Sequence, residues 1–351
     1  MALIKINNRS SEDNAIQGRR NLIINGAMEI AQRGTSSTGT GYQTVDRFAV
    51  NQSNYDELSA TKTQDSSAPD GFTKSFKVLV STEETTVAAD EYANISYAIE
   101  GQDLQRLAYG TSSAKSFTLS FYVKSNVTGN FSVTAYKQTG SNKQQDRRYT
   151  INTANTWERK TLTFVGDTAQ SVADDVNAGM YLYWHLGFGS NFGTDTYDAS
   201  AGWSAYTNAG WGAGQDVELL DTQNNYIQIT GVQMEVGDLA TPFEHRTQGE
   251  YERECERYYQ IVDVYFSTGS YTWAYHYYEP FEFRTVMRAA PTIEKSSGTS
   301  GTGTATTTDA TNTAHNGLVL IQATQYAANC RGGSTNSFSY MNARCHFKSE
   351  I

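Results

Sequence analysis

Short runs in which apolar and polar residues alternate fill the chain from about residue 21 to residue 243. The clearest run, residues 115–124, carries phenylalanine, leucine and valine at its central odd positions and hydroxylated or charged residues at its even ones. Such alternation is typical of a strand with one face in a core. About nine or ten strands of this kind fit, at the spacing of a β-sandwich or jelly roll. The pattern therefore predicts an all-β chain with an N-terminal jelly-roll β-sandwich over residues 21–245.

Local patterns add detail to this domain. Residues 126–130 form a turn between the run just described and the alternating residues 131–136, which predicts a hairpin. The apolar positions change from odd to even at Thr230-Gly231, which predicts a β-bulge there. Asn21–Ile24 has the pattern of a strand with one apolar face, and Asn25-Gly26 that of the turn after it.

One segment has helical spacing instead. Thr247 and Glu250 form a capping box, in which the threonine precedes the helix and the glutamate follows three residues later. Behind it, apolar residues recur at helical intervals up to Val262. The pattern predicts a helix over about residues 248–262, within a linking segment, residues 246–262, between two domains.

The remaining residues, 263–351, predict a small C-terminal β-sheet domain. One alternating run places four aromatic residues on one face: Tyr271, Trp273, Tyr275 and Tyr277. About 90 residues are few for independent stability, so we expect this face to be buried against identical chains in a homotrimer. Further strands are expected directly after Pro280 and at residues 317–322, where apolar residues on both faces indicate a central strand. The Ser/Thr/Gly tract from Ser296 to Ala314 indicates a surface loop or an exposed ribbon.

Composition supports this division and excludes several functions. The 351 residues exceed what one hydrophobic core usually serves, which favours two domains. The net charge of −10 disfavours binding to nucleic acid or to anionic membrane surfaces. No apolar run approaches the roughly 18 residues of a spanning helix, so no membrane insertion is expected. The N-terminus has no apolar signal region and the three cysteines are scattered, so we expect synthesis in a reducing cytosol.

No motif indicates a catalytic or cofactor site. The five histidines lack metal-ligand spacing, and neither a nucleotide-binding glycine loop nor a GxSxG elbow is present. We therefore expect no catalytic residue, no cofactor and no enzymatic activity. Paired acids between residues 166 and 222 leave two alternatives open, a polysaccharide-degrading enzyme and a structural Ca²⁺ site.

A loop-rich stretch, residues 191–215, mixes aromatic residues with Gly, Ser, Asn and Asp. Aromatic rings stack on the apolar faces of sugars while neighbouring amides and carboxylates bond the hydroxyls, so this mixture is typical of glycan sites. The glycan-binding candidates are Trp203, Tyr206, Trp211, Tyr197, Asp195 and Asp198. The alternative is that Trp203 and Trp211 close the rim of the sandwich or pack against a neighbouring subunit.

A series of short motifs marks both ends of the predicted jelly roll and the residues that follow it. At the N-terminal end these are residues 21–28 (NLIINGAM), 31–34 (AQRG) and 42–48 (YQTVDRF). At the close of the same module they are residues 231–237 (GVQMEVG), 240–244 (ATPFE) and 255–259 (CERYY), and residues 287–292 (MRAAPT) follow. In this order the motifs resemble those of bacteriophage tail-fibre and related virion proteins, in which the last motif is similar to the entry of a C-terminal sheet.

The resemblance implies a jelly roll of the carbohydrate-binding-module type, homotrimeric assembly, and a place on the tail or surface of a virion after synthesis in the bacterial host cytoplasm. It also implies contact with a host-surface glycan or other receptor, and docking to other virion proteins through an N-terminal arm, residues 1–20. It implies no catalytic residue, because the matching motifs are structural. A trimeric tail fibre or fibre tip is the expected function. The alternative is a head-decorating or tail-appendage structural protein without a receptor role.

Overall fold

The structure, a computed structural model, describes residues 19–138, 140–267, 276–300, 318–333 and 340–351. The chain divides into two compact units, residues 1–247 and 248–351, named here the first and the second unit. Apart from one α-helix and one 3-10 helix, all regular elements of the described part are strands, so the predicted all-β class is confirmed. Neither of these described helices is long and apolar enough to cross a membrane.

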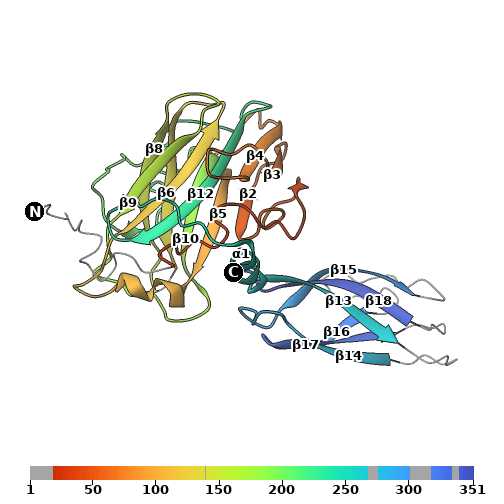
Figure 1. Ribbon diagram of the computed structural model, residues 1–351. Coiled ribbons are helices and arrows are strands. Elements are labelled where there is room, and N and C mark those ends of the chain that lie inside the picture. The colour runs from red at the N-terminus through yellow and green to blue at the C-terminus, as the bar shows by residue number, and fades with distance from the viewer. Residues whose placement is uncertain (1–18, 139, 268–275, 301–317, 334–339) are drawn as a thin grey trace, which may run out of the picture. The chain divides into compact units, whose positions relative to one another are not determined.

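Two six-stranded antiparallel sheets form the first unit (Figure 1). Sheet one has the strand order β1-β3-β4-β12-β6-β9, and sheet two has the order β11-β8-β7-β10-β5-β2. The elements, with η2 the 3-10 helix, are β1 (Ser36–Ser37), β2 (Phe48–Ser53), β3 (Ser59–Asp65), β4 (Ser75–Thr82), β5 (Tyr92–Glu100), η2 (Gly101–Leu107), β6 (Phe117–Ser125), β7 (Gly129–Lys137), β8 (Lys143–Ile151), β9 (Glu158–Phe164), β10 (Ala178–Phe188), β11 (Ser204–Ala205) and β12 (Tyr226–Val236). The chain crosses repeatedly between the sheets, as in the predicted jelly roll.

The core lies between the two sheets and takes every second residue of their strands. On β6 the apolar residues at odd positions are fully buried, as predicted. On β10 the even positions from Met180 to Leu186 are buried, and the ring of Trp184 lies 5.8 Å from that of Phe121 on β6. Burial stabilises the fold by roughly 1.5–3 kcal/mol for each large apolar side chain. The odd residues of β10 therefore point to the outer face of sheet two.

The predicted β-bulge in β12 is confirmed. The register between β12 and β6 shifts between Thr230 and Gln233, and Gly231 has a φ of 60°. Ile229 and Val232, on the two sides of Gly231, are both fully buried. The extra residue returns the apolar side chains of β12 to the core, which explains why their positions change parity.

The predicted hairpin across residues 126–130 is wrong. β6 pairs with β9 and β12 in sheet one, whereas β7 pairs with β8 and β10 in sheet two. The turn therefore crosses from one sheet to the other. Alternation alone cannot distinguish the two cases, because Phe121 and Phe131 enter the same core from opposite sheets.

The predicted strand at Asn21–Ile24 is also wrong, and an asparagine side chain explains why. The segment has no regular structure before its turn. The Asn21 side chain accepts the N–H of Met234 at 3.0 Å and donates to the carbonyl of Val232 at 3.1 Å. It therefore satisfies β12 groups that a strand backbone would otherwise bond. The predicted turn at Asn25-Gly26 is present, with Asn25 at a φ of 58°.

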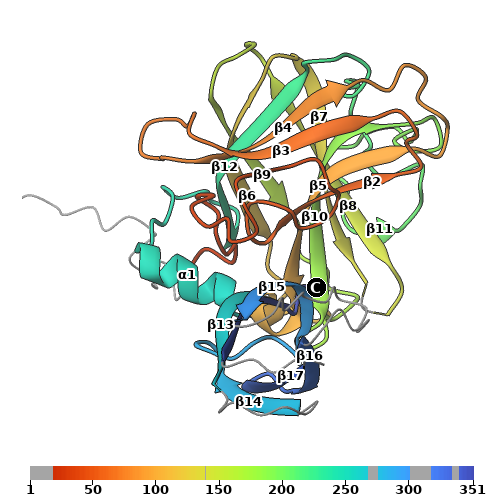
Figure 2. The ribbon, with the colours of Figure 1, turned by 90° about the vertical axis from the view of Figure 1, so that its right-hand side faces the viewer.

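The second unit begins with α1 (Gln248–Glu256) and continues into β13 (Tyr259–Ser267) (Figure 2). The predicted helix starts where expected but ends at Glu256 instead of about residue 262. Residues 259–262 fit a strand as well as a helix, because aromatic and β-branched residues favour strands. Nine paired positions with β18 (Tyr340–Lys348) decide for the strand.

Two three-stranded antiparallel sheets form the rest of the described second unit, with the orders β13-β18-β15 and β14-β17-β16. Their other strands are β14 (His276–Glu282), β15 (Thr292–Ser300), β16 (Leu318–Ala323) and β17 (Ala327–Gly333). The predicted small C-terminal β-sheet domain is therefore confirmed.

Details of this unit differ from the sequence predictions. Pro280 lies inside β14, and β14 is an edge strand, where a missing backbone N–H is tolerated. The described part of the apolar run at residues 317–322 belongs to β16, which is an edge strand and not a central one. The tract beginning at Ser296 is paired with β18 as far as Ser300.

The trimer candidates Tyr271, Trp273 and Tyr275 lie outside the described residues. Tyr277 lies in β14 opposite Gly332 of β17, and its side chain is also outside the description. The homotrimer therefore stays a prediction.

We expect Gly231→Ala to destabilise the first unit by about 1–3 kcal/mol, because backbone strain at positive φ is added to a steric clash. A β-carbon there would lie 2.7 Å from the Phe72 ring. Gly202→Ala is the matched control, since the nearest atom to its β-carbon, on Val165, would be 3.7 Å away. Urea unfolding followed by tryptophan fluorescence measures both variants. Equal midpoints would show that the bulge does not require glycine.

Candidate functional site

The aromatic stretch predicted to bind glycan lies in the 189–217 loop, which connects β10 towards β12 and contains β11. Hydrogen bonds fasten this loop to the outer face of sheet two. β11 pairs with β8. The N–H of Gly212 donates to Asp146 Oδ1 on β8 at 2.9 Å, and Ser132 Oγ on β7 donates to the Gly212 carbonyl at 3.0 Å. The strands therefore determine where the aromatic residues of the loop lie.

Trp211 anchors this loop. It is buried, and its ring meets those of Tyr92, His185 and Tyr183 edge to face at centroid distances of 4.8, 4.6 and 5.7 Å. Phe192 of the same loop packs at 5.4 Å. Because these rings cover its surface, Trp211 holds the loop against sheet two and has no exposed face on which a sugar could stack.

Trp203 packs against a buried ion pair. Its indole N–H donates to the carbonyl of Val165 at 2.7 Å. The ammonium of Lys137 lies 4.7 Å from the Trp203 ring centroid and 5.0 Å from that of Tyr109, and it bonds Asp167 at 2.5 Å. A desolvated cation over aromatic faces is held strongly. Trp203 therefore fastens the loop to the rim of the sandwich.

Three further candidates are held within the same region. Asp198 accepts the N–H and hydroxyl of Ser200, which lowers the pKa of its carboxyl. The hydroxyl of Tyr197 accepts the N–H of Arg148, whose guanidinium lies 4.9 Å from the Tyr197 ring. Asp195 is exposed. Among the interactions of the described residues, none joins the side chains of these three residues to that of Tyr206.

Tyr206 joins a different group of aromatic residues, named here the tyrosine row: Tyr136 on β7, Tyr181 and Tyr183 on β10, and Tyr206 on the loop. The ring of Tyr136 lies 5.4 Å from Tyr206, 6.3 Å from Tyr181 and 6.1 Å from Tyr183. Tyr181 and Tyr183 stack with ring planes 6° apart at 5.7 Å. All except Tyr136 are half-buried. The row therefore offers partly exposed rings on the outer face of sheet two.

Sequence reasoning missed three members of this row, although a signal was present. Residues 180–186 alternate in the sequence, with the apolar residues at the even positions. Alternation then sends Tyr181 and Tyr183 outward, and the same argument applies to Tyr136 on β7. The sequence does not show that these rings lie close together, because Tyr181 comes opposite Tyr136 only through the pairing of β10 with β7.

Polar side chains lie beside the tyrosine row on β5 and β2. Ser96 is directly opposite Tyr183 in the register of β10 with β5. The amide of Asn51 donates to Ser96 Oγ at 3.0 Å and to Asn94 Oδ1 at 3.3 Å. Within the described structure, Asn94 Nδ2 is buried without a hydrogen-bond partner. The face thus combines aromatic rings with amide and hydroxyl groups, and no charged side chain lies directly opposite Tyr183 on β5.

A chain of polar groups, of which Thr134 and His185 are fully buried, supports the loop. Thr134 Oγ1 donates to Asp146 Oδ1 and lies 2.8 Å from His185 Nε2. Burial raises the pKa of Asp146 to about 7, although the hydrogen bonds from Thr134 and Gly212 oppose this rise. Burial lowers the pKa of His185 to about 3, so its imidazole is neutral near pH 7. In a catalytic triad the histidine lies between the hydroxyl and the carboxylate. Here the threonine hydroxyl lies between the histidine and the carboxyl, so the arrangement is not that of a triad.

The acids between residues 166 and 222 bond within their own surroundings. Asp175 accepts the backbone and side-chain N–H groups of Asn177, and Asp216 accepts those of Asn130. These contacts hold loops and strand ends in place.

One group of acids in the described structure could hold a metal ion, and it lies outside the stretch where Ca²⁺ was considered. Carboxylate oxygens of Asp56, Glu84 and Glu91 lie within 4.8 Å of one another. Glu84 and Glu91 are buried, and burial raises the pKa of Glu91, with neighbouring acids adding to the rise. Carboxylate oxygens are the ligands that Ca²⁺ prefers, so the residue types fit such an ion.

No protein-family model matches the chain, and no curated protein matches it. Among solved structures, the chain is similar to the enzymatically active domain of tailspike protein 4 of bacteriophage CBA120, at 15% identity and a TM-score of 0.34, over 62% of this chain and 21% of that chain. It is also similar to the family 16 carbohydrate-binding module-2, at 14% identity and a TM-score of 0.28, over 61% and 99% of the chains. A family 11 carbohydrate-binding module of the cellulosomal cellulase Lic26A-Cel5E of Clostridium thermocellum matches at 10% identity and a TM-score of 0.29, over 60% and 98%. Likenesses with TM-scores below 0.5 carry no conclusion for this chain.

Asp146→Asn should raise the melting temperature of the first unit by an amount that grows from pH 4 to pH 7. The folded pKa of about 7 lies above the unfolded value of roughly 3.9, so the wild-type protein loses stability as the pH rises between the two values. Asparagine keeps the acceptor oxygen for Thr134 and Gly212 without the charge. Thermal melts from pH 4 to pH 8 measure the difference, and Asp70→Asn at an exposed position controls for losing one acid. A gain that is constant with pH would contradict a raised pKa.

Proposed function

We propose that the first unit binds a host-surface carbohydrate through the tyrosine row and the polar groups beside it. The observation that carries this proposal is the row itself: four tyrosines from two strands and one loop, with neighbouring ring centroids 5.4–6.3 Å apart. They lie on the outer face of a sheet whose inner face is occupied by the core. Packing of the sandwich does not require rings on that face.

Tyrosine suits sugar binding for two physical reasons. Its ring stacks on the C–H face of a sugar, and its hydroxyl bonds the sugar's oxygens. Tyr181 and Tyr183 are already held against each other with nearly parallel planes. Side chains that are ordered before binding lose little conformational entropy when the ligand arrives, so more of the contact energy appears as affinity.

The neighbouring β-strands supply the polar part of the site. Ser96 lies opposite Tyr183 on β5, and the amide of Asn51 on the next strand, β2, donates a hydrogen bond to the Ser96 hydroxyl. A hydroxyl and an amide can each exchange hydrogen bonds with sugar hydroxyls. Because no charged residue lies opposite Tyr183 on β5, the site favours uncharged sugar residues at this position.

The 189–217 loop completes the site by positioning Tyr206. The hydroxyl of Tyr206 donates to Asn208 Oδ1 at 2.8 Å, and its backbone N–H bonds the carbonyl of Asn142 at 2.9 Å. Trp203 and Trp211 fasten the loop at two other points. In this proposal the two tryptophans support binding indirectly, and Tyr206 is the member of the predicted set that touches the sugar.

We further propose that the chain is a non-enzymatic component of a bacteriophage virion, a trimeric tail fibre or fibre tip that attaches to the host. The motifs at residues 21–48 and 231–259 that resemble virion proteins support this role. Three copies would present three sugar sites, and the resulting avidity would make weak single contacts useful. In the same proposal, residues 1–20 dock other virion proteins.

Tyr181→Ala and Tyr183→Ala should each weaken carbohydrate binding by about tenfold, since an aromatic contact contributes roughly 0.5–1.5 kcal/mol beyond the area it buries. The measurement is the affinity of the purified protein for host lipopolysaccharide or capsule. Oligosaccharide fragments that compete for this binding are then titrated into each variant. Tyr326→Ala is the matched control, because Tyr326 is an exposed tyrosine of the second unit.

Trp211→Ala separates support from contact in the same assay. We expect it to lower both the melting temperature and the affinity, whereas Tyr181→Ala, at a half-buried position of the tyrosine row, lowers the affinity with little change in melting temperature. Wild-type affinity in both β10 variants would remove the tyrosine row from the proposal.

Gold-labelled antibody against the chain should decorate the tail of intact virions in electron micrographs, because a receptor-binding subunit must reach the host surface. Pre-immune antibody on the same particles is the control. Label over the capsid would instead favour a head-decorating protein.

A further inference from the structure

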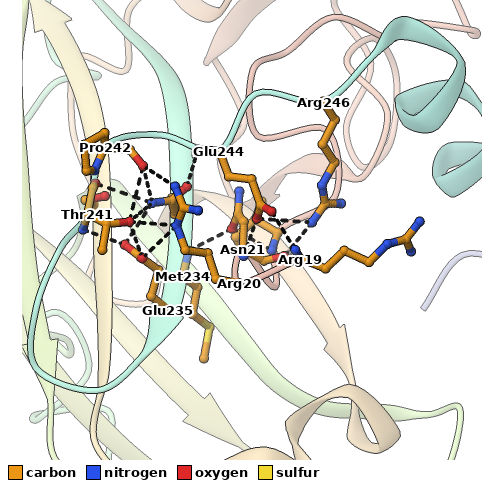
Figure 3. A network of polar contacts seen from close by, with 12 residues as sticks. Arg19, Arg20, Asn21, Met234, Glu235, Thr241, Pro242, Glu244 and Arg246 are labelled. Carbon is orange, nitrogen blue, oxygen red and sulfur yellow. Dashed lines mark hydrogen bonds and ion pairs between the residues drawn. The ribbon is translucent and has the colours of Figure 1, made fainter. Parts of the chain in front are cut away.

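The two ends of the first unit are fastened to each other (Figure 3). Residues 19–22 lie where the described chain begins, and residues 241–246 lie directly before the unit ends at Thr247. More than 200 residues of sandwich separate the two segments in the sequence, since Arg19 and Glu244 are 225 positions apart. We name the two segments together the terminal strap.

Glu244 makes the central contact of the terminal strap. Its Oε1 accepts the backbone N–H of Arg19 at 2.6 Å, and its Oε2 accepts that of Asn21 at 2.8 Å. In the opposite direction, Arg246 Nη2 donates to the Asn21 carbonyl at 2.8 Å. Hydrogen bonds with one charged partner are roughly twice as strong as neutral ones. The two segments are thus joined by three charge-assisted bonds within a few residues.

Arg20 makes a second set of contacts. Its guanidinium donates to Thr241 Oγ1 and to the carbonyl of Pro242, both at 2.8 Å. Its Nε also lies 3.4 Å from Glu235 Oε1, and the Glu235 side chain is only 5% exposed. A partly buried ion pair is screened much less by salt than an exposed one.

Both segments are also attached to β12, a strand inside sheet one. The N–H of Leu22 bonds the carbonyl of Met234 at 3.0 Å, and the N–H of Glu244 bonds Gln233 Oε1 at 2.7 Å. The terminal strap therefore ends on a strand that has neighbours on both sides. Pulling the two ends apart acts first on the contacts between the segments, since these lie nearest the points where force enters.

We propose that the terminal strap carries mechanical tension past the sandwich. Tension that enters at Arg19 and leaves at Thr247 passes through Glu244, Arg246 and Arg20 and through their attachments to β12, so the other strands between residues 23 and 240 are bypassed until these contacts break. The strap must then rupture before any core strand moves. If the first unit binds carbohydrate as proposed above, the device keeps the tyrosine row undistorted while an attached particle pulls on its anchor.

The test is single-molecule unfolding of the full-length chain at constant force, with handles at the N-terminus and at Thr247. Glu244→Gln leaves one acceptor oxygen in place of two and removes the charge. We expect it to speed rupture by about tenfold, the factor that follows from losing one charge-assisted hydrogen bond. Asp238→Asn, which removes an exposed acid from the connection between β12 and the strap, should leave the rate unchanged.

A second pulling direction separates tension from general stability. With handles at Thr86 and Thr153, both exposed residues in loops, force reaches the strands without crossing the terminal strap. Glu244→Gln should then change the rupture rate far less. Arg246→Lys, a milder change, should show the same difference between directions. Equal acceleration in both directions, or none in the first, would overturn the proposal, and carbohydrate binding of the unloaded variants reports on the proposed function separately.

Discussion

Packing of two sheets on one shared layer of side chains is the constraint on which the first unit depends. Each strand gives its alternate residues to this layer, and Trp184 lies within it, with its ring 6.4 Å from that of Phe48 and 5.8 Å from that of Phe121. Because these residues are held inward, their sequence neighbours must point outward. The tyrosine row is the functional consequence, since Tyr181 and Tyr183 flank a buried leucine and precede the buried Trp184.

The outer face of sheet two shows how the fold holds an irregular segment in place. The 189–217 loop is fastened by Asp146, by Trp211 among four other aromatic rings, and by Trp203 over the Lys137–Asp167 pair. Burying a carboxyl with a pKa of about 7 costs stability in its charged form. In return, the hydrogen bond from Gly212 to Asp146 holds the loop in a fixed position. A side chain that binds a ligand, such as Tyr206 in our proposal, requires such a fixed position.

The terminal strap extends the same logic to the ends of the unit. A sandwich whose first and last segments are joined behaves as a closed body, in which neither end can fray without breaking charge-assisted bonds to the other. Asn21 contributes most to this closure, because its side chain bonds β12 while its backbone bonds Glu244 and Arg246. The strap and the tyrosine row thus rest on different strands, β12 in sheet one and β10 in sheet two.

Alternation in the sequence by itself determined the all-β class, the jelly-roll region, most strand positions and the bulge at Gly231, because the side-chain period of a strand follows from local geometry. Even the direction of Tyr181 and Tyr183 was contained in it. Only the tertiary structure decided which strands pair, and so placed β6 and β7 in different sheets, ended α1 at Glu256 through pairing with β18, and brought Tyr136 and Tyr206 beside the β10 tyrosines. Those outcomes depend on contacts between residues far apart in the sequence, whose energies no local pattern contains.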